Sequence, residues 1–470
     1  IASSAVRGRL TVVAVLALAV GMFSGCAAGP EYKRPDVDMP ATFKEAEGWK
    51  VAEPRDELPR GSWWQVFEDP ALHDIEQQVQ MSNQNIREAE AQYRAAQAAV
   101  RAAQAGAFPS ISGRSGASRS GTGNGSSSQF TLAVDAGWEF DLWGRIRKTI
   151  EAGQASAQVS ASELEGIRLS AQISLAQSYF QMRVADLQRQ LLDETVTGYE
   201  RSLQLVNNQY NVGLVARGDV IQAQTQLKSA QAQAVDAGIQ RAQFEHAIAL
   251  LVGKAPAALS IPTAPVRLAV PAIATGLPSR LLERRPDVAA AERRMAAANA
   301  QIGVARAAFF PALTLSASVG LQSSSLANLF SLPSRIWSIG PALAGALFDA
   351  GLRRAQSDQA VANYDAAVAS YRQTVLTALQ EVEDNLVALR LLEQEAAIQD
   401  EAVKAASQSV QIALNQYRAG TTSYVTVVTA QNTLFTNQRT ALDITRRRLV
   451  AAVGLIGALG GGWSETPQRD

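Results

Sequence analysis

Apolar and polar residues alternate with a period of two in two separate stretches of the chain. In residues 130–142 the even positions are apolar, whereas the odd positions include Asp135 and Glu139. Residues 313–322 repeat this alternation, with Leu, Ala and Val set against Thr, Ser, Gly and Gln. Because successive side chains of a β-strand point to opposite faces, each stretch predicts a strand with one apolar and one polar face.

Two further stretches alternate less regularly and complete the predicted strands. Residues 110–118 precede the first stretch, and residues 336–348, which include Pro341, follow the second. We therefore expect four strands per chain. The Gly- and Ser-rich run 113–129 is expected to join the first two strands as a long flexible loop.

Long segments without proline follow each pair of strands. No proline occurs from residue 110 to 255 or from residue 342 to 466. An interior proline costs a helix about 3 kcal/mol, and Ala, Gln, Leu, Glu and Arg favour helix, so these segments predict helices of about 100 Å. Gly213 and Gly420 stand where a tight turn between helices needs a positive φ, so each long helix should end in a helical hairpin tip.

The two halves of the chain carry the same landmarks in the same order. Residues 209–213 return as residues 416–420 at an offset of 207, and the Ala-Gln pair at 223 returns at 430. A Phe-Pro pair and a Phe-Asp pair also recur in both halves. Ordered landmarks of this kind indicate an internal duplication, which chance similarity between Ala- and Gln-rich helices does not explain.

The N-terminus has the charge, apolar core and small residues typical of a secretory signal. Two arginines precede the apolar run 10–20, which is shorter than the about 20 residues of a transmembrane helix. Residues 23–26 (Phe-Ser-Gly-Cys) resemble the lipobox of bacterial lipoproteins, so we expect cleavage before Cys26 and its acylation, palmitate included. An unmodified cysteine beside an ordinary cleavage site is the alternative. Ala27, rather than Asp, follows, which in lipoproteins implies the outer membrane as destination.

The predicted strands, together with the secretory signal and the lipobox-like segment, favour an outer-membrane β-barrel over a soluble half-buried sheet. Four strands cannot close, and an open sheet edge is not tolerated in lipid. Single-chain barrels have at least about eight strands, so several copies must each contribute a sheet. A dimer would give a barrel of eight strands and a trimer a barrel of twelve. Only the larger barrel leaves an evident aqueous path through its interior.

Charge and rare residues exclude several classes of function. The chain of 470 residues carries 43 basic and 43 acidic side chains, so its net charge is zero. It therefore has no net positive electrostatic field to attract nucleic acid, and no such partner is expected. One cysteine and two histidines, His73 and His246, cannot form a disulfide framework or a zinc cluster. The carboxylates are dispersed along helices and no phosphate-binding loop follows a strand, so we expect neither an enzyme nor a cofactor.

Four segments carry a family resemblance over the chain from Cys26 to Trp463. They are 62–72 (SWWQVFEDPAL), 277–287 (LPSRLLERRPD), 305–311 (ARAAFFP) and 458–463 (ALGGGW). These segments resemble signature sequences of the TolC-like outer membrane factors, and within them the efflux outer-membrane lipoproteins of the NodT-type branch.

The resemblance implies a mixed α and β fold that is mostly α. It implies a homotrimer whose 12-stranded outer-membrane β-barrel, with four strands per chain, continues into a long periplasmic α-helical barrel. Such a protein is the lipid-anchored, barrel-embedded channel of a tripartite efflux system in the outer-membrane lipid. It passively conducts drugs and toxic compounds to the exterior from a periplasmic adaptor (membrane fusion protein) and an inner-membrane pump of the RND type, and so supports multidrug resistance.

Two other functions stay open at this point. A duct for protein or peptide secretion would share the same architecture. A lipid-anchored coiled-coil spacer would explain the helices but leave the alternating strands unexplained.

The resemblance places a periplasmic gate and the adaptor contacts at the two hairpin tips. The residues that match gating positions are Tyr210, Asp219, Tyr417, Arg418, Tyr424 and Thr429. The residues expected to contact the adaptor are Gly213, Leu214, Val215, Gly420, Thr421 and Thr422. The alternative for the tyrosines at 210 and 417 is that they pack at the start of a turn. Some relatives carry a ring of Asp where Thr429 stands, and this sequence does not predict such a ring.

The expected organisation has six segments. They are a signal peptide at 1–25, a lipidated N-terminal tether at 26–61, a first structural repeat at 62–255, a Pro-rich equatorial linker at 256–276, a second structural repeat at 277–463 and a C-terminal tail at 464–470. Each repeat should contain a helix, two strands, a long helix and a return helix.

Overall fold

A computed structural model describes most of the chain, and its residues fall into two compact units. The described residues are 29–36, 39–40, 42–45, 62–123, 125–264, 269–271 and 284–461. The expected signal peptide, Cys26 and the C-terminal tail lie outside these residues, as do parts of the tether, the linker and the signature segments. One unit comprises Ile1–Val37, Ala91–Ser162 and Ala290–Gln373, and the other comprises Asp38–Glu90, Glu163–Ala289 and Thr374–Asp470.

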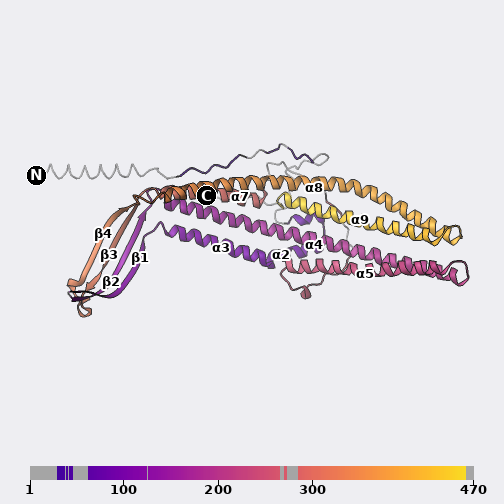
Figure 1. The fold of residues 1–470 in the computed structure, drawn as a ribbon, viewed down its shortest axis with the longest axis horizontal. Coiled ribbons are helices and arrows are strands. Elements are labelled where there is room, and N and C mark those ends of the chain that lie inside the picture. Colours follow the sequence, from indigo (N-terminus) through magenta and orange to yellow (C-terminus); the bar gives the residue numbers. More distant parts are fainter. Residues whose placement is uncertain are drawn as a thin grey trace. The chain divides into compact units, whose positions relative to one another are not determined.

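The same succession of elements occurs twice along the chain (Figure 1). The first set is α3 (Gln84–Ala105), β1 (Ser110–Thr122), β2 (Gly125–Phe140), α4 (Arg145–Asn211) and α5 (Arg217–Leu251). The second set is α7 (Pro286–Ala307), β3 (Ala312–Ser323), β4 (Arg335–Ala344), α8 (Leu352–Arg418) and α9 (Tyr424–Ala458). Because α4 and α8 have 67 residues each and α5 and α9 have 35 each, the predicted duplication is confirmed.

Short elements precede the first set, follow it, or lie between β3 and β4 of the second set. They are η2 (Trp63–Phe67), α2 (Pro70–Ser82), η3 (Pro256–Ala258), η5 (Leu326–Asn328) and η6 (Leu332–Ser334). Asp69 caps α2, since one of its carboxylate oxygens accepts from the backbone N–H groups of Ala71 and Leu72 at 2.9 and 3.1 Å. Its other oxygen accepts from the Tyr179 hydroxyl at 2.8 Å, so the same side chain also fixes α2 against α4.

The four strands form one antiparallel sheet in the order β1-β2-β3-β4, as the alternation predicts. Val134 lies opposite Gly113 on one side and Val319 on the other. Its neighbour Asp135 lies between Ser112 and Ser318, on the polar face. The apolar face is exposed in the isolated chain, at Ile111, Val134, Val319, Trp337 and Ile339 among others.

The Gly- and Ser-rich run 113–129 is not a loop, and this expectation was wrong. β1 continues to Thr122, which pairs with Gly125 at the start of β2, so the two strands extend through the run. Small polar residues can form a full antiparallel ladder because the ladder bonds are made by the backbone. Side chains add cross-strand contacts, such as that between the Ser120 and Ser127 hydroxyls at 3.3 Å.

The fourth strand is shorter than its alternation suggests, because it ends at Ala344 instead of residue 348. The chain then passes so close to Pro311 that a Cβ on Gly345 would lie 3.2 Å from the Pro311 Cα. Pro341 lies within β4 opposite Leu315. β4 is an edge strand, where a residue without an N–H group is tolerated.

The beginning of the Pro-rich linker is held by ionic side chains of α4 and α5. Arg183 donates to the Pro262 carbonyl at 2.8 Å and pairs with Asp186 at 3.3 Å. Arg241 bridges Asp186 and Glu245, each at 2.9 Å. Glu245 also accepts from the Ile261 N–H at 2.6 Å. Because these groups are largely buried, loss of one partner would leave an uncompensated charge.

The described parts of the N-terminal tether make specific contacts with the helices. Arg34 donates to the Tyr371 hydroxyl at 3.0 and 3.1 Å and pairs with Glu292 at 3.5 Å. Further along, the backbone N–H groups of Lys44 and Glu45 donate to the Glu383 carboxylate at 2.6 and 2.8 Å. The Pro-rich composition of this segment did not indicate these specific contacts.

Candidate functional site

The α4/α5 and α8/α9 turns share one backbone geometry. Gly213 and Gly420 have φ of 79° and 73°, as predicted, in the left-handed region that only glycine adopts without strain. The N–H of Leu214 donates to the Gln209 carbonyl at 2.9 Å, and the N–H of Thr421 donates to the Gln416 carbonyl at 3.0 Å. Together with the bonds from the glycine N–H groups to Tyr210 and Tyr417, this is the Schellman arrangement that terminates a helix.

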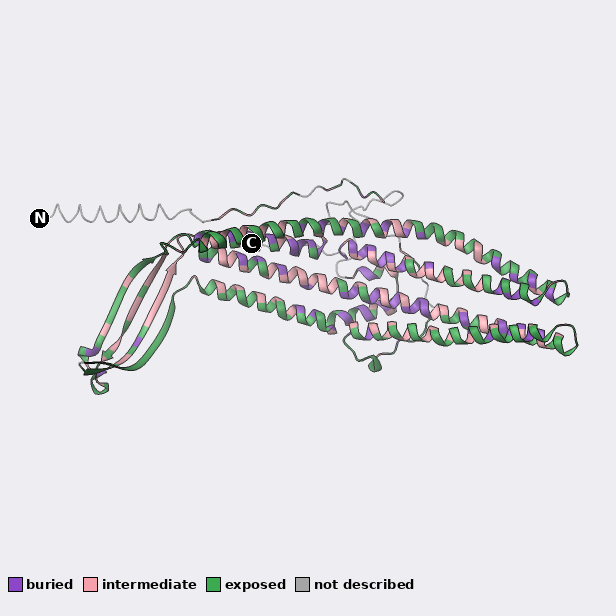
Figure 2. Cartoon of the chain, in the orientation of Figure 1, coloured by how far each residue is buried: buried purple, intermediate pink, exposed green. Residues whose placement is uncertain are grey.

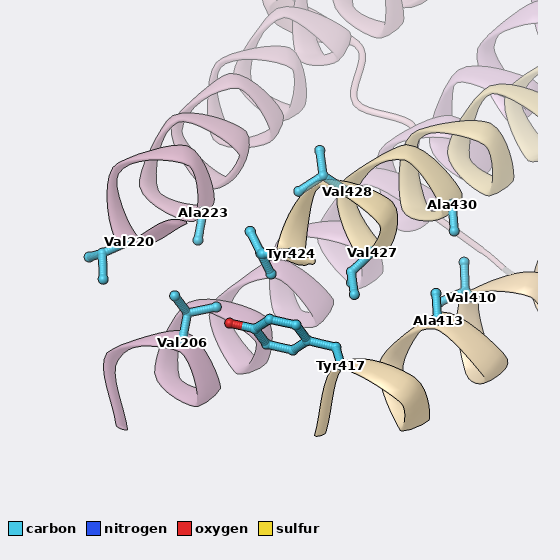
Figure 3. Close-up of a cluster of buried hydrophobic side chains, with 10 residues drawn as sticks. All are labelled: Val206, Val220, Ala223, Val410, Ala413, Tyr417, Tyr424, Val427, Val428 and Ala430. Carbon is cyan, nitrogen blue, oxygen red and sulfur yellow. The ribbon is translucent and has the colours of Figure 1, made fainter. Parts of the chain in front are cut away.

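Behind the turns, the two hairpins pack together through one apolar cluster (Figure 3). Its buried members come from all four helices: Val206, Val220, Ala223, Val410, Ala413, Tyr417, Tyr424, Val427, Val428 and Ala430. Several are matched pairs of the duplication, since Val206 corresponds to Ala413 and Val220 corresponds to Val427. The cluster therefore joins the tips of the two repeats within one protomer.

Tyr417 and Tyr424 belong to this cluster, with their ring centroids 5.4 Å apart. Tyr417 is only 4% exposed, and its hydroxyl is buried without a hydrogen-bond partner. Burial, together with the negative charge of Asp219, raises the pKa of Tyr417. Burial also raises the pKa of Tyr424 to about 12, with smaller contributions from Tyr417, Tyr199 and Asp219. Both tyrosines are therefore neutral packing residues at physiological pH.

Of the remaining gate candidates, Tyr210, Arg418 and Thr429 are exposed and Asp219 is half-buried. Tyr210 is 42% exposed, and Arg418 is exposed with one long contact, 3.5 Å, to the Asn415 side-chain oxygen. Asp219 is near the two buried tyrosines, whose pKa values it affects. Thr429 is exposed, and its hydroxyl donates to the Val425 carbonyl of its own helix at 2.9 Å. The structure thus separates the six candidates into buried tyrosines and accessible polar groups.

The two tips present different chemistry to solvent. The first tip exposes apolar side chains, with Val212 70% and Leu214 72% exposed, while Val215 packs against the cluster. The second tip exposes hydroxyls: Thr421 donates to the Gln416 carbonyl at 3.0 Å, and Thr422 donates to the Thr426 hydroxyl at 3.1 Å. One tip is therefore suited to an apolar partner surface and the other to a polar one.

A polar network that sequence reasoning missed lies just behind the cluster. The Gln431 amide donates to the Ser202 hydroxyl at 3.0 Å, and both side chains are buried. Gln226 donates to the Tyr199 hydroxyl at 3.0 Å and also to the side-chain oxygen of Asn432. Only Gln431 had a sequence signal, because it belongs to the Ala-Gln pair that recurs in both halves.

Neither of two other kinds of site occurs in the described part of the chain. None of its helices combines the length and the apolar character needed to cross a bilayer. The same residues contain no group of three or more His, Cys, Asp or Glu side chains placed to hold a metal ion.

A small sheet with an exposed apolar face and two very long helical hairpins define the class of outer-membrane channels, and comparison with known proteins agrees. The profile described as outer membrane efflux protein matches residues 76–254 and 277–461. The toluene efflux pump outer membrane protein TtgC of Pseudomonas putida is 32% identical over 96% of both chains. The cation efflux system protein CusC of Escherichia coli is 30% identical, over 94% of this chain and 97% of CusC.

Solved structures agree with the sequence comparison. The outer-membrane channel OprN superposes with a TM-score of 0.87 at 30% identity, covering 93% of this chain and all of OprN. The chain belongs to the outer membrane efflux protein family. It is thus an outer-membrane component of an efflux system that extends into the periplasm, and the predicted family, mostly helical fold and function are confirmed.

The unpartnered Tyr417 hydroxyl leads to a prediction about stability. Tyr417→Phe removes a buried hydroxyl that has no partner, so the melting temperature should stay the same or rise slightly. Tyr417→Ala should cost about 3–5 kcal/mol, because it empties a packed site. The equivalent exposed residue supplies a matched control, since Tyr210→Phe and Tyr210→Ala should both have small effects. Thermal unfolding followed by circular dichroism measures all four, and equal losses for the two Tyr417 variants would contradict this account.

Proposed function

We propose that three copies of this chain form the exit duct of a tripartite efflux system. Their sheets would combine into a 12-stranded barrel in the outer membrane, continued by a periplasmic helical barrel. The observation that carries this proposal is a sheet with an exposed apolar face, in which β1 and β4 each pair on one side only among the described strands. In lipid such edges must be paired by another chain.

Aromatic residues at the helix-proximal end of the sheet support this placement. Trp138 donates its indole N–H to the Ala107 carbonyl at 3.0 Å, and Trp143 donates to the Pro311 carbonyl at 2.8 Å. The Trp143 ring stacks on Phe310 with centroids 4.6 Å apart. Tryptophan is enriched where a membrane protein crosses from lipid to water, because its body is apolar and its N–H needs a polar partner.

The hairpin tips are the proposed periplasmic entrance and adaptor site. The exposed Leu214 of the first tip suits an apolar surface of the adaptor, and the Thr421 and Thr422 hydroxyls suit a polar one. Arg418 and Asp219 are the charged groups proposed to make contacts that hold the entrance closed. Each such contact is worth about 1 kcal/mol or less, which the binding energy of an adaptor can offset. An inner-membrane pump of the RND type completes the assembly.

The duct is proposed to carry small molecules passively and without strong selection. The names of the two relatives refer to toluene and to cations, which have little chemistry in common. A duct of this shared architecture therefore need not select the compounds that it transports. The pump would select the drugs or other toxic compounds. Catalysis plays no part in this proposal.

Lipid attachment at Cys26 is a further part of the proposal. It rests on the apolar run and the small residues that precede this cysteine. Mass spectrometry of the mature protein should find an acylated N-terminal cysteine. Cys26→Ser should remove the anchor while leaving the sheet able to insert, since the sheet carries its own apolar face. An unmodified mature protein that begins elsewhere would remove the anchor from the proposal.

Conductance in a planar bilayer tests the proposed duct and its entrance. The purified protein should form channels that rest mostly closed. Arg418→Ser should raise the open probability about tenfold or more, because three equivalent contacts of about 0.5–1 kcal/mol are lost together. Arg439→Ser makes the same charge change on α9, far from the turn, and should leave the open probability unchanged. Absence of any conductance would refute the duct, whereas equal behaviour of the two variants would refute only the gate.

Neighbouring positions of β2 test which face of the sheet meets lipid. Val134→Arg places a charge on the apolar face, at a cost of about 2–4 kcal/mol near the bilayer midplane. Asp135→Arg loses the 3.4 Å pair with Arg114 but leaves the new charge on the proposed wet face, so it should be milder. The amount of assembled trimer in isolated outer membranes measures both. Tolerance of the first change and loss of assembly with the second would reverse the two faces.

A further inference from the structure

The two pairs of strands end differently on the side away from the helices. β1 and β2 end there in Gly and Ser residues, whereas the connection between β3 and β4, residues 324–334, carries large apolar side chains. Three of these, Leu326, Phe330 and Leu332, are 61, 75 and 71% exposed. Exposed residues also predominate in the edge strands β1 and β4 (Figure 2). A connection with several exposed apolar side chains indicates a partner other than water.

The β3–β4 connection is folded by hydrogen bonds among its own residues. The hydroxyls of Ser331 and Ser334 both donate to the Asn328 carbonyl, at 2.6 and 2.7 Å. In η5 and η6, the N–H of Leu329 donates to the Leu326 carbonyl at 3.2 Å, and the N–H of Ser334 donates to the Ser331 carbonyl at 3.1 Å. Leu329 and Ser334 are buried. Internal pairing of this kind is what polar groups require in an apolar medium, where no water can bind them.

The lengths of the strands place this connection within the apolar band of a membrane. Phe130 precedes Trp138, at the helix-proximal end, by eight residues, and it pairs with Ser323, the last residue of β3. At about 3.3 Å per residue and a tilt of about 40°, this is a rise of about 20 Å, which is less than the apolar band of about 25 Å. β2 extends five residues further, to Gly125, so the polar ends of β1 and β2 reach beyond the band.

An arginine lies on the apolar face directly after the connection. Arg335 lies opposite Leu321, and Trp337 lies opposite Val319, so alternation puts Arg335 on the same face as these apolar residues. Arg335 is exposed, and among the described residues it has no hydrogen bond or ion pair. An arginine on a surface that faces lipid is unfavourable unless its guanidinium reaches the headgroups, where phosphates can accept its N–H groups.

The far part of the sheet has basic charges only, although the whole chain is neutral. Residues 107–134 and 312–348 contain three arginines, at 114, 119 and 335, and no Asp or Glu. Arg114 lies on the polar face, where it pairs with Asp135 at 3.4 Å. Arg119 shares the face of Arg335 and donates to the Ser126 hydroxyl at 3.1 Å. The outward face therefore ends in two arginines with no acid beside them, which favours an anionic partner.

We infer that this end of the sheet binds a phosphorylated lipid of the outer leaflet. The acyl chains lie against the exposed apolar side chains of the β3–β4 connection, and a headgroup phosphate accepts from the Arg335 guanidinium, with Arg119 as a second cation. The apolar connection continues the face that is proposed to meet lipid, and the arginines supply the charge that a phosphate requires. This inference rests on the proposed barrel and adds the class of lipid that its outer end selects.

A polarity-sensitive thiol label tests the lipid contact of the connection. Single cysteines are introduced into the Cys26→Ser chain, and the labelled protein is placed in bilayers with or without brominated acyl chains. Labels at Phe330→Cys and Leu332→Cys should be quenched severalfold by the brominated chains, as should a label at Val134→Cys on the apolar face. A label at Ser127→Cys, in the polar end of β2, should be little affected.

The Val134→Cys label separates this inference from the proposed function. Quenching at position 134 without quenching at 330 and 332 overturns the lipid contact of the connection and leaves the duct in place. Absence of quenching at all three positions overturns the proposed placement of the sheet in lipid. Quenching at all three supports the inference.

Retention of lipid A, a phosphorylated glycolipid, tests the phosphate contact. Native mass spectrometry of the purified protein with added lipid A should show retention that falls about fivefold in Arg335→Gln, the effect of one arginine near an anionic surface. Arg114→Gln makes the same charge change on the polar face and should retain lipid A as the parent does. Dephosphorylated lipid A should bind the parent weakly. Equal retention by the two variants, or of the two lipids, overturns the phosphate contact.

Discussion

The unpaired backbone groups on the outer sides of β1 and β4 constrain everything else in this protein. An exposed apolar face suits the sheet to lipid, where no water is available to satisfy an edge N–H or C=O group. The remaining solution is that the edge strands pair with the edge strands of further copies of the chain. The helices that continue from the strands must then form a closed ring with the same number of copies. The two helical hairpins of one protomer are matched in length, which suits a closed ring because each hairpin then spans the same distance along it.

Sequence reasoning was most successful where a pattern reflects a single local cause. Alternation in residues 130–142 reports the two faces of a strand, and a glycine at residues 213 and 420 reports a positive φ at each turn. Equal spacing between such landmarks revealed the duplication. The family segments supplied the membrane and the efflux role, which periodicity does not contain.

Features that depend on tertiary contacts were less accessible. The run 113–129 looks flexible by composition, yet its backbone is held by the partner strand. Tyr417 and Tyr424 were candidates for the gate because of their position near a turn, but only the packing of four helices shows that they are buried. The hydrogen bond from Arg34 to Tyr371 joins residues that are far apart in the chain, and no local sequence pattern predicts it. The pairing of Ser202 with Gln431 is of the same kind.

The equal lengths of the long helices bear on how such a chain can change during evolution. Loss of about two turns from one arm of a hairpin would misalign its two helices by about 10 Å, and any change that is not close to whole turns would also rotate its apolar positions away from their partners. Insertions and deletions are thus tolerated only when α4 and α5 change together, and when α8 and α9 change by the same amount. Lineages that need a longer or shorter periplasmic reach should therefore differ by concerted, roughly heptad-sized steps at four places in one gene.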